Sequence, residues 1–379
     1  MRTAFRLLLT ALCLLPTVHS CAQRTNDDVE LKRQIAQMLM IGFRGMELKP
    51  DMTVYNDIKK LGIGGIILFD YDAPLKIYKR NITSPKQLKK LIAGLQAAAP
   101  VKLLVAIDQE GGKVNRLKTR YGFPPTVSAQ YIGKVNNADT TAKHAAAMAK
   151  TLSNLGFNLN FAPAVDLNVN PACPIIGKVE RSFSADIEVV VQHATICLEE
   201  QQKQGVTGCI KHFPGHGSSA ADTHLGITDV TNTWTAQELE PFRQLIAAAK
   251  VDVVMTSHVF NAHLDGEYPA TMSKKIITGI LREQLGFTGV VVTDDLAMGA
   301  LVDHYSLDEI LLKAIEAGAD LLCLSNNGKS YDDHIARKAV DIIFKAVKQG
   351  RITPERINAS YSRIMALKES TNYTNYTNN

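Results

Sequence analysis

Segment 211–224 concentrates side chains that can carry chemistry, since one lysine, three histidines and one aspartate lie within it. It follows an apolar run, Val206–Ile210, and ends in Asp222, Thr223 and His224. A carboxylate two residues from an imidazole can hold the ring in one tautomer and raise its basicity, and a proton shuttle needs both effects. The spacing therefore predicts a proton donor and acceptor at His224, supported by Asp222. The structural alternative is a solvated loop whose histidine has no role.

A second candidate is the aspartate pair Asp294 and Asp295, which follows the apolar run Val290–Thr293. A carboxylate at the end of a buried strand can be a nucleophile, a general base or a metal ligand, whereas its neighbour can cap the following helix. We predict that Asp294 is the nucleophile and that Asp295 is the cap. A retaining glycosidase needs such a carboxylate about 5 Å from a proton donor, and His224 on a loop above Asp294 can be that donor.

Five further residues can bind a polar substrate. Lys211, His212 and Arg181 are hydrogen-bond donors suited to sugar hydroxyls or to an acetamido carbonyl. Asp108 can accept bonds from two hydroxyls, and Arg116 can clamp either Asp108 or the substrate. The structural alternative for Arg181 is an ion pair with a neighbouring carboxylate. The glycines after Asp108 do not form a GxGxxG pattern, so no nucleotide-binding fingerprint is predicted.

Eight apolar runs of strand length alternate with longer amphipathic segments and must position these residues. The runs are continuous rather than alternating, as expected for parallel strands that are buried on both faces. Eight such units over roughly 330 residues predict an α/β fold, a single-domain (β/α)8 TIM barrel, whose catalytic face lies at the C-terminal ends of the strands. The alternative is a doubly wound open sheet. The predicted strands are Met38–Phe43, Gly65–Phe69, Leu103–Ile107, Asn158–Ala162, Val206–Ile210, Val251–Thr256, Val290–Thr293 and Asp320–Leu324.

The N-terminal region has the pattern of an export signal. Two arginines precede the apolar run Leu7–Val18, which is too short for a stable membrane span and of signal-peptide length. We predict a signal peptide over residues 1–22. Cys21 is expected to be lipidated within a loose lipobox, and cleavage after Ala22 is the alternative. The protein is therefore expected to be exported, as a periplasmic protein or a membrane-anchored lipoprotein of a bacterium.

The rest of the chain predicts one catalytic barrel over residues 28–368 and a disordered polar tail over residues 369–379. The 379 residues carry a formal net charge of +5, dispersed along the sequence, so no nucleic-acid partner is expected. No cysteine pair has CxxC spacing, so neither a disulfide framework nor a structural zinc site is predicted. The protein is expected to be a monomer.

Four motifs occur in an order and spacing that are similar to those of one enzyme family. They are KHFPGHG (211–217) followed by Asp222-Thr223-His224, Asp108-x-Glu110-Gly111-Gly112 with Arg116, Arg181-Ser182-Phe183, and Gly286-Phe287-x-Gly289 with Thr293-Asp294. From about residue 30 to residue 367 the chain resembles glycoside hydrolase family 3, and more narrowly its β-N-acetylhexosaminidase branch.

The resemblance implies a retaining, exo-acting β-N-acetylglucosaminidase that acts on peptidoglycan fragments, chitin oligomers or other glycans. Asp294 would be the nucleophile, and His224 the general acid/base that Asp222 orients. The resemblance implies no metal or organic cofactor. The implied binding residues for the non-reducing N-acetylglucosamine are Asp108, Arg116, Arg181, Lys211 and His212.

Four features depart from the family pattern. Thr223 replaces a common serine, and the stretch after His224 lacks a proline often found there. Residues 69–75 have the character of an insertion, which we expect to reshape the pocket rim. The export signal also differs from the cytoplasmic members that recycle cell-wall fragments.

Three other functions remain open from the sequence. His212, His216, Asp222 and His224 are residue types that can form a metal site, as in a metal-dependent barrel hydrolase. The chain can also be a non-catalytic sugar-binding lipoprotein. Finally, a glycoside phosphorylase of the same family would transfer the sugar to phosphate.

Overall fold

The computed structural model describes residues 15–371, with side chains from residue 26 onward, and its central feature is a sheet of eight parallel strands. Each predicted run overlaps one of these strands. The strands are β1 (Leu39–Gly42), β2 (Gly65–Ile67), β5 (Leu104–Ile107), β6 (Leu159–Asn160), β7 (Thr207–Phe213), β9 (Val253–Thr256), β11 (Val290–Val292) and β12 (Leu322–Leu324).

The order of the strands in the sheet is β11-β9-β7-β6-β5-β2-β1-β12. A parallel bridge between Val292 and Leu321 joins the two outer strands and closes the sheet. This closure, with all pairs in the sheet parallel, confirms the predicted (β/α)8 barrel, and the open-sheet alternative is wrong.

Strand β7 is longer than the sequence predicted. It continues to Phe213, which pairs with Thr256 of β9 after a register shift. Lys211 and His212 are therefore part of the strand and are buried within it, rather than lying on the loop that follows. This placement fixes both side chains more firmly than a loop would.

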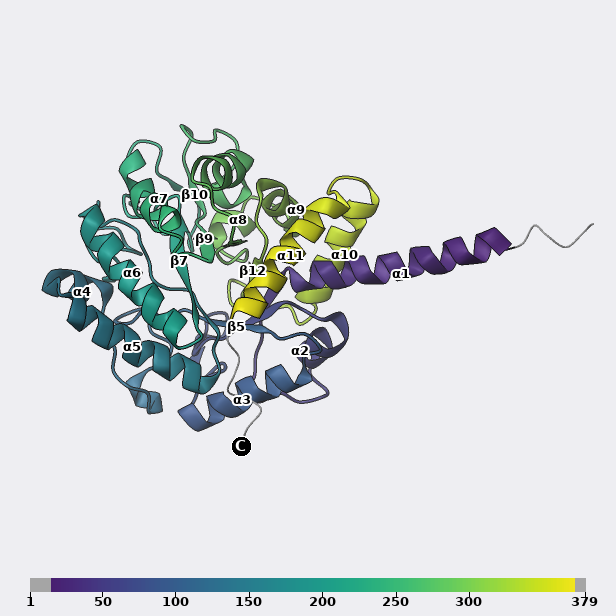
Figure 1. Ribbon diagram of the computed structural model, residues 1–379, viewed down its shortest axis with the longest axis horizontal. Coiled ribbons are helices and arrows are strands. Elements are labelled where there is room, and N and C mark those ends of the chain that lie inside the picture. Colours follow the sequence, from purple (N-terminus) through teal and green to yellow (C-terminus); the bar gives the residue numbers. More distant parts are fainter. Residues whose placement is uncertain (1–14, 372–379) are drawn as a thin grey trace, which may run out of the picture.

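Helices surround the strands (Figure 1), and one contiguous cluster of buried apolar side chains connects the two layers. The longer helices are α1 (Leu15–Gln37), α3 (Pro85–Ala98), α5 (Ala138–Leu155), α6 (Ile187–Lys203), η5 (Lys275–Gln284), α9 (Leu307–Ala317), α10 (Ile335–Lys348) and α11 (Pro354–Ser370). The shorter ones are α2 (Thr53–Asn56), η1 (Asp57–Leu61), η2 (Thr119–Tyr121), α4 (Ala129–Val135), η3 (Ala236–Leu239), α7 (Glu240–Ala247), η4 (Ala270–Met272) and α8 (Gly299–Val302).

Local sequence signals set the limits of the helices that flank the site. Asp186 caps α6, because its carboxylate accepts the backbone N–H groups of Glu188 and Val189. Gly156 ends α5 in a left-handed conformation with φ of 100°. The four cysteines with described side chains, Cys173, Cys197, Cys209 and Cys323, are free.

The two ends of the chain bear on the predicted domain limits. Residues 1–14 of the predicted signal peptide lie outside the described residues, as does the side chain of the proposed lipidation site, Cys21. Within the described part, none of the helices is both long and apolar enough for a membrane crossing. At the other end, α11 continues through Ser370, and the buried Thr371 hydroxyl donates to the Leu367 carbonyl. The predicted tail therefore begins too early, and residues 372–379 lie outside the described part.

Candidate active site

One cavity at the C-terminal ends of the strands is lined by all eight predicted site residues. It also receives the aromatic and polar side chains of the segment after β2, including Phe69 and Asp70. The structure thus brings together residues that lie up to 186 positions apart in the chain, from Asp108 to Asp294. The eight are Asp108, Arg116, Arg181, Lys211, His212, Asp222, His224 and Asp294.

Asp294 lies two residues beyond β11, and its surroundings favour the ionised carboxylate. The Asp295 backbone N–H donates to its Oδ1 at 2.8 Å. Burial would raise the pKa of Asp294, but the imidazoles of His258, His212 and His224, together with that N–H group, lower it to about 2. The group is therefore an anion throughout the physiological range, as a carboxylate nucleophile must be.

Asp295 is not the helix cap that the sequence predicted, because α8 begins at Gly299 with Met298 at its N-cap and has no side-chain cap hydrogen bond. Asp295 instead holds the turn before that helix. Its Oδ1 accepts the Ala297 N–H at 3.1 Å, which fixes the turn before α8. The same oxygen accepts the Ser325 N–H at 2.9 Å, and the Ser325 hydroxyl donates to Oδ2. Asp295 thus ties the end of β11 to the end of β12 and leaves the cavity to Asp294.

The Asp222–His224 pair lies on the loop after β7. One oxygen of Asp222 accepts both the backbone N–H of His224, at 2.8 Å, and its Nδ1, at 2.7 Å. Because a carboxylate only accepts, Nδ1 carries the proton, and no hydrogen bond from a described residue reaches Nε2. The His224 side chain is 62% exposed. Burial lowers the pKa of His224, but the bond to Asp222 and the charge of Asp294 raise it above the ordinary value.

This loop is packed against the chain that follows Asp294. The Ala300 N–H donates to the Thr223 carbonyl at 3.0 Å. At Gly299 a Cβ atom would lie only 2.7 Å from the His224 carbonyl oxygen, so a glycine is needed for the two segments to approach this closely. The packing explains how a loop residue is held over the strand end that carries Asp294.

Asp166 is a site residue that the sequence did not predict, and it lies four residues after the predicted strand Asn158–Ala162. It is fully buried. Its Oδ2 accepts Nδ1–H of His212 at 2.7 Å, and its Oδ1 accepts the backbone N–H groups of His212 and His216. His212 Nε2 in turn accepts a bond from Arg181 at 2.9 Å. Both nitrogens of His212 are therefore engaged, and the ring is fixed as part of the cavity wall.

A buried ion-pair network forms the opposite part of the wall. Lys211 Nζ lies 2.9 Å from Asp108 and 2.8 Å from Glu110. Arg181 forms two parallel bonds with Glu110, at 2.8 and 2.7 Å, and Arg116 lies 3.4 Å from Asp108. Burial raises the pKa values of Asp108 and Glu110, but these cations lower both below the ordinary range.

The network shows that the two interpretations of Arg181 are compatible, since it lines the cavity and is also ion-paired. Glu110, its partner, is a second residue that the sequence did not assign to the site. The motif that contains it was noted, but the contact spans 71 positions and has no local signature.

Glu238 is the third residue that the sequence did not assign. It lies on η3, and its buried Oε2 accepts the backbone N–H groups of Gly217 at 2.9 Å and Ser218 at 3.3 Å. A Cβ atom at Gly215, where φ is 121°, would lie 2.6 Å from the Cβ of Glu238. Burial is the main cause that raises the pKa of Glu238 to about 7. Glu238 therefore anchors the start of the loop that carries Asp222 and His224.

The expected insertion at residues 69–75 shapes the rim. A two-stranded antiparallel hairpin, β3 (Tyr71–Asp72) and β4 (Ile77–Tyr78), rises there. Asp72 holds it through ion pairs with Arg44 at 2.7 Å and Arg80 at 2.8 Å. Tyr71 and Ala73 line the cavity, so the segment does contribute to the pocket.

The four residues of the metal alternative do not form an ion site. His216 Nδ1 is 2.7 Å from Ser219 Oγ, and burial lowers the pKa of this imidazole to about 4. In the described residues, no three His, Cys, Asp or Glu side chains are grouped so that they can share a metal ion.

Comparisons with known proteins agree with this geometry. Residues 30–367 match the glycosyl hydrolase family 3 N-terminal domain. The chain is similar to β-hexosaminidase A of Pseudoalteromonas piscicida, with 32% identity over 379 residues that cover 89% of this chain and 60% of that protein. It is also similar to a β-hexosaminidase of Tolumonas auensis, with 34% identity, covering 76% of this chain and 83% of that protein.

A solved structure has the same fold. The family 3 β-N-acetylglucosaminidase from Paenibacillus sp. str. FPU-7 superimposes with a TM-score of 0.81 and 38% identity, covering 90% of this chain and 62% of that one. The chain thus spans about three fifths of the length of the Pseudoalteromonas and Paenibacillus proteins.

Proposed function

The chain belongs to glycosyl hydrolase family 3, and on that basis we propose that it is a retaining exo-β-N-acetylglucosaminidase. It would release terminal, non-reducing N-acetylglucosamine from β-glycosides. One observation carries the proposal. The ionised Asp294 and the Asp222-supported His224 line the same cavity, and double displacement needs a carboxylate nucleophile and a proton carrier in one site.

In the first step the Asp294 carboxylate attacks the anomeric carbon, and the bond from that carbon to the leaving oxygen breaks. His224, protonated on both nitrogens, gives the proton on Nε2 to the departing oxygen. Asp222 stabilises the imidazolium through the 2.7 Å bond to Nδ1, which is the cause of the raised pKa. The products of this step are a glycosyl ester on Asp294 and the free aglycone.

In the second step water hydrolyses the glycosyl ester on Asp294. His224, now neutral, accepts a proton from the water at Nε2 while the water oxygen attacks the anomeric carbon and Asp294 leaves. A histidine suits this double role beside Asp294, because a second carboxylate so near would be repelled by the first anion.

The ion-pair network supplies the sugar-binding groups in this proposal. Asp108 lies at the cavity, and Lys211 and Arg116 balance its charge. Its oxygens can therefore accept hydrogen bonds from sugar hydroxyls without an unpaired charge being buried. His212 and Arg181 would contact the acetamido group or a neighbouring hydroxyl. We also propose that the protein is an exported, lipid-anchored monomer that acts on peptidoglycan fragments or other extracellular glycans.

The test is fluorophore release from methylumbelliferyl β-N-acetylglucosaminide by the protein without residues 1–22. The matching β-glucoside, a chelator and added phosphate serve as comparisons. Release from the N-acetyl substrate alone, unaffected by chelator and phosphate, is expected. Loss with chelator would support a metal-dependent hydrolase, and dependence on phosphate would support a phosphorylase. No fluorophore release from either glycoside, with or without phosphate, would contradict the proposed reaction.

A further inference from the structure

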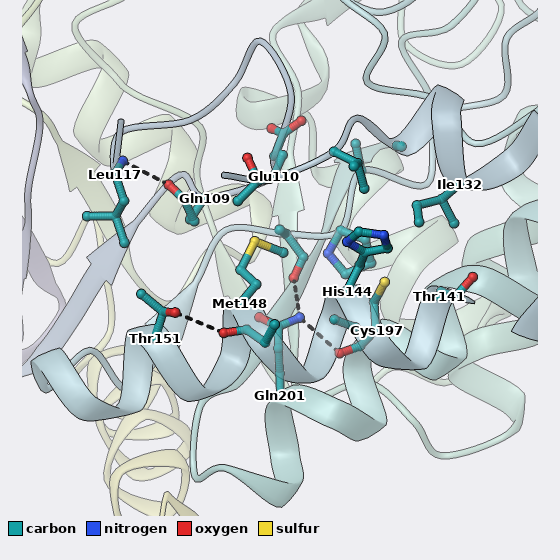
Figure 2. A pocket seen from close by; sticks show the side chains of 18 of the residues that line it. Gln109, Glu110, Leu117, Ile132, Thr141, His144, Met148, Thr151, Cys197 and Gln201 are labelled. Carbon is teal, nitrogen blue, oxygen red and sulfur yellow. Dashed lines mark hydrogen bonds between the residues drawn. The ribbon is translucent and has the colours of Figure 1, made fainter. Parts of the chain in front are cut away.

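A second cavity lies behind the wall of the catalytic one, between α5, α6 and the segment 117–132 (Figure 2). Its volume is about 130 Å³. Its outer edge includes the exposed residues Pro124, Pro125 and Ala147, so it is open to solvent. None of the steps proposed above uses this cavity.

The walls of this second cavity are mainly apolar. They include two phenylalanines, two prolines at the mouth, and aliphatic side chains from the barrel and both helices. A dry, apolar protein cavity on the order of 150 Å³ is known to bind benzene, so a volume of this size suits one six-membered ring. The main apolar lining residues are Leu117, Phe123, Ile132, Met148 and Phe183.

One buried side-chain oxygen of this cavity, Oε1 of Gln201, can accept a hydrogen bond from an occupant. Gln201, 2% exposed, reaches the cavity from α6 (Figure 2). Its Nε2 donates to the carbonyls of Ala162 at 3.3 Å and Cys197 at 3.2 Å. These two bonds fix the orientation of the amide, because a flip would direct Oε1 at two carbonyl oxygens. Oε1 then has no hydrogen-bond partner among the described residues. A buried acceptor of this kind calls for a donor from an occupant.

The charged residues at the inner end are already paired. Arg181 and Glu110 line the cavity, but they bond to each other, and Arg181 also bonds to Ile175 and His212. Lys211 contacts the same glutamate at 2.8 Å. An ionic occupant would therefore find no uncompensated counter-charge, whereas a neutral one buries apolar surface without breaking a pair.

We propose that this cavity is an accessory binding site for a small neutral molecule with one aromatic ring and one O–H or N–H donor, such as a phenol. The ring packs against Phe123, Phe183 and Met148, and the donor bonds to Oε1 of Gln201. The site shares Arg181 with the catalytic cavity and is otherwise separate from the chemistry. The proposal does not depend on the activity proposed above.

The test is a methyl NMR titration of the full chain labelled with [methyl-¹³C]methionine. Met148 reports on the accessory cavity, and Met255 and Met298 report on the catalytic one. Phenol is the probe, and toluene is its counterpart without a donor. A saturable shift at Met148 alone is expected, with phenol binding about three- to tenfold more tightly than toluene, as one net hydrogen bond predicts.

Ala147→Phe, which closes the mouth, should weaken phenol binding at least about tenfold, since the ring fills the entrance. Lys150→Phe, an equally bulky change at an exposed position of α5 outside the cavity, should leave binding unchanged. No saturable shift at Met148, or the same shift in Ala147→Phe, would overturn the proposal, because water alone would then satisfy Gln201. Equal affinity for phenol and toluene would also overturn it, since Oε1 would not be recognised.

Discussion

The site contains two aspartate–histidine pairs with the same bond in opposite surroundings. In both, a carboxylate oxygen accepts Nδ1–H at 2.7 Å. The side chains of Asp166 and His212 are 0% and 5% exposed, whereas those of Asp222 and His224 are 25% and 62% exposed. The buried pair lies on the barrel, and the exposed pair lies on a loop packed over it.

Surroundings, not the bond, separate the roles of the two pairs. His212 Nε2 is occupied by Arg181, so a proton there would break an existing bond in a buried region. His224 Nε2 has no such partner among the described residues, and water reaches the ring. The buried pair therefore fixes geometry, and the exposed pair can exchange protons. The imidazoles of both pairs lower the pKa of Asp294, so both pairs act on the same carboxylate.

Substitution of Asp294 has the largest expected effect. Asp294→Asn keeps both pairs but removes the nucleophile, so kcat should fall by about a thousandfold or more, because covalent catalysis supplies several kcal/mol of barrier lowering. The measurement is steady-state hydrolysis of the methylumbelliferyl glycoside. Circular dichroism and the melting temperature provide the folding control. Retention of more than about a tenth of the rate would contradict the nucleophile assignment.

The exposed pair should act through its proton. His224→Ala should slow glycosides with poor leaving groups by about a hundredfold to ten-thousandfold, the usual effect of a general acid. Activated aryl glycosides, whose leaving group needs no proton, should lose much less in the first step. Comparison of kcat/KM for a chitin disaccharide and an aryl glycoside measures the difference. Equal losses on both substrates would show that His224 does not act as the acid.

The buried pair should act through stability. Asp166→Asn replaces one carboxylate oxygen by an NH₂ group, which then faces either the His212 Nδ1–H or the backbone N–H groups of His212 and His216. About 3 to 5 kcal/mol of unfolding free energy should therefore be lost. Asp222→Asn is the matched change in the exposed pair and should cost less than about 1 kcal/mol. Thermal and urea unfolding measure both. Similar losses in the two variants would remove the distinction between the pairs.

The sequence predicted the barrel and indicated the proposed reacting residues because the signals of both are local. Continuous apolar runs mark the strands, and Asp294 and the Asp222–His224 step stand beside such runs or within three residues of each other. Asp166, Glu110 and Glu238 were not assigned to the site, because each bonds to a partner that is distant in the sequence. The separation is 46 positions for Asp166, 71 for Glu110 and 21 for Glu238. No spacing rule connects residues that only the closed barrel brings together.

The pH dependence should distinguish the pairs more finely. The pKa of His224 is raised by Asp222, and the acid must be protonated in the first step, so kcat/KM should fall as pH rises through that pKa. In Asp222→Asn this raising contribution is lost, and the alkaline limb should move to lower pH. Asp294, with a pKa of about 2, should not produce a limb near neutral pH. A profile whose alkaline limb is the same in the variant would show that His224 is not the titrating group.

Glu238 tests the connection between the two pairs. Glu238 holds Gly217 and Ser218, which lie between His212 and Asp222 in the chain. Its folded pKa of about 7 lies above the ordinary value of 4.5, so the folded state retains the proton longer than the unfolded state. Stability should therefore decrease as pH rises from about 4.5 to 7, by on the order of 2 to 3 kcal/mol.

In Glu238→Gln the side chain can still accept the two N–H bonds but cannot ionise, so this part of the pH dependence should disappear. The measurement is the unfolding free energy of both proteins at pH 5 and pH 7.5. Glu240→Gln is the control, because Glu240 lies two residues after Glu238 and forms an ion pair with Arg243 at the surface. If the Glu238→Gln variant and the unmodified protein lose the same stability over this range, another buried group must cause the loss. Glu238 would then hold the loop at Gly217 and Ser218 in a way that does not depend on pH.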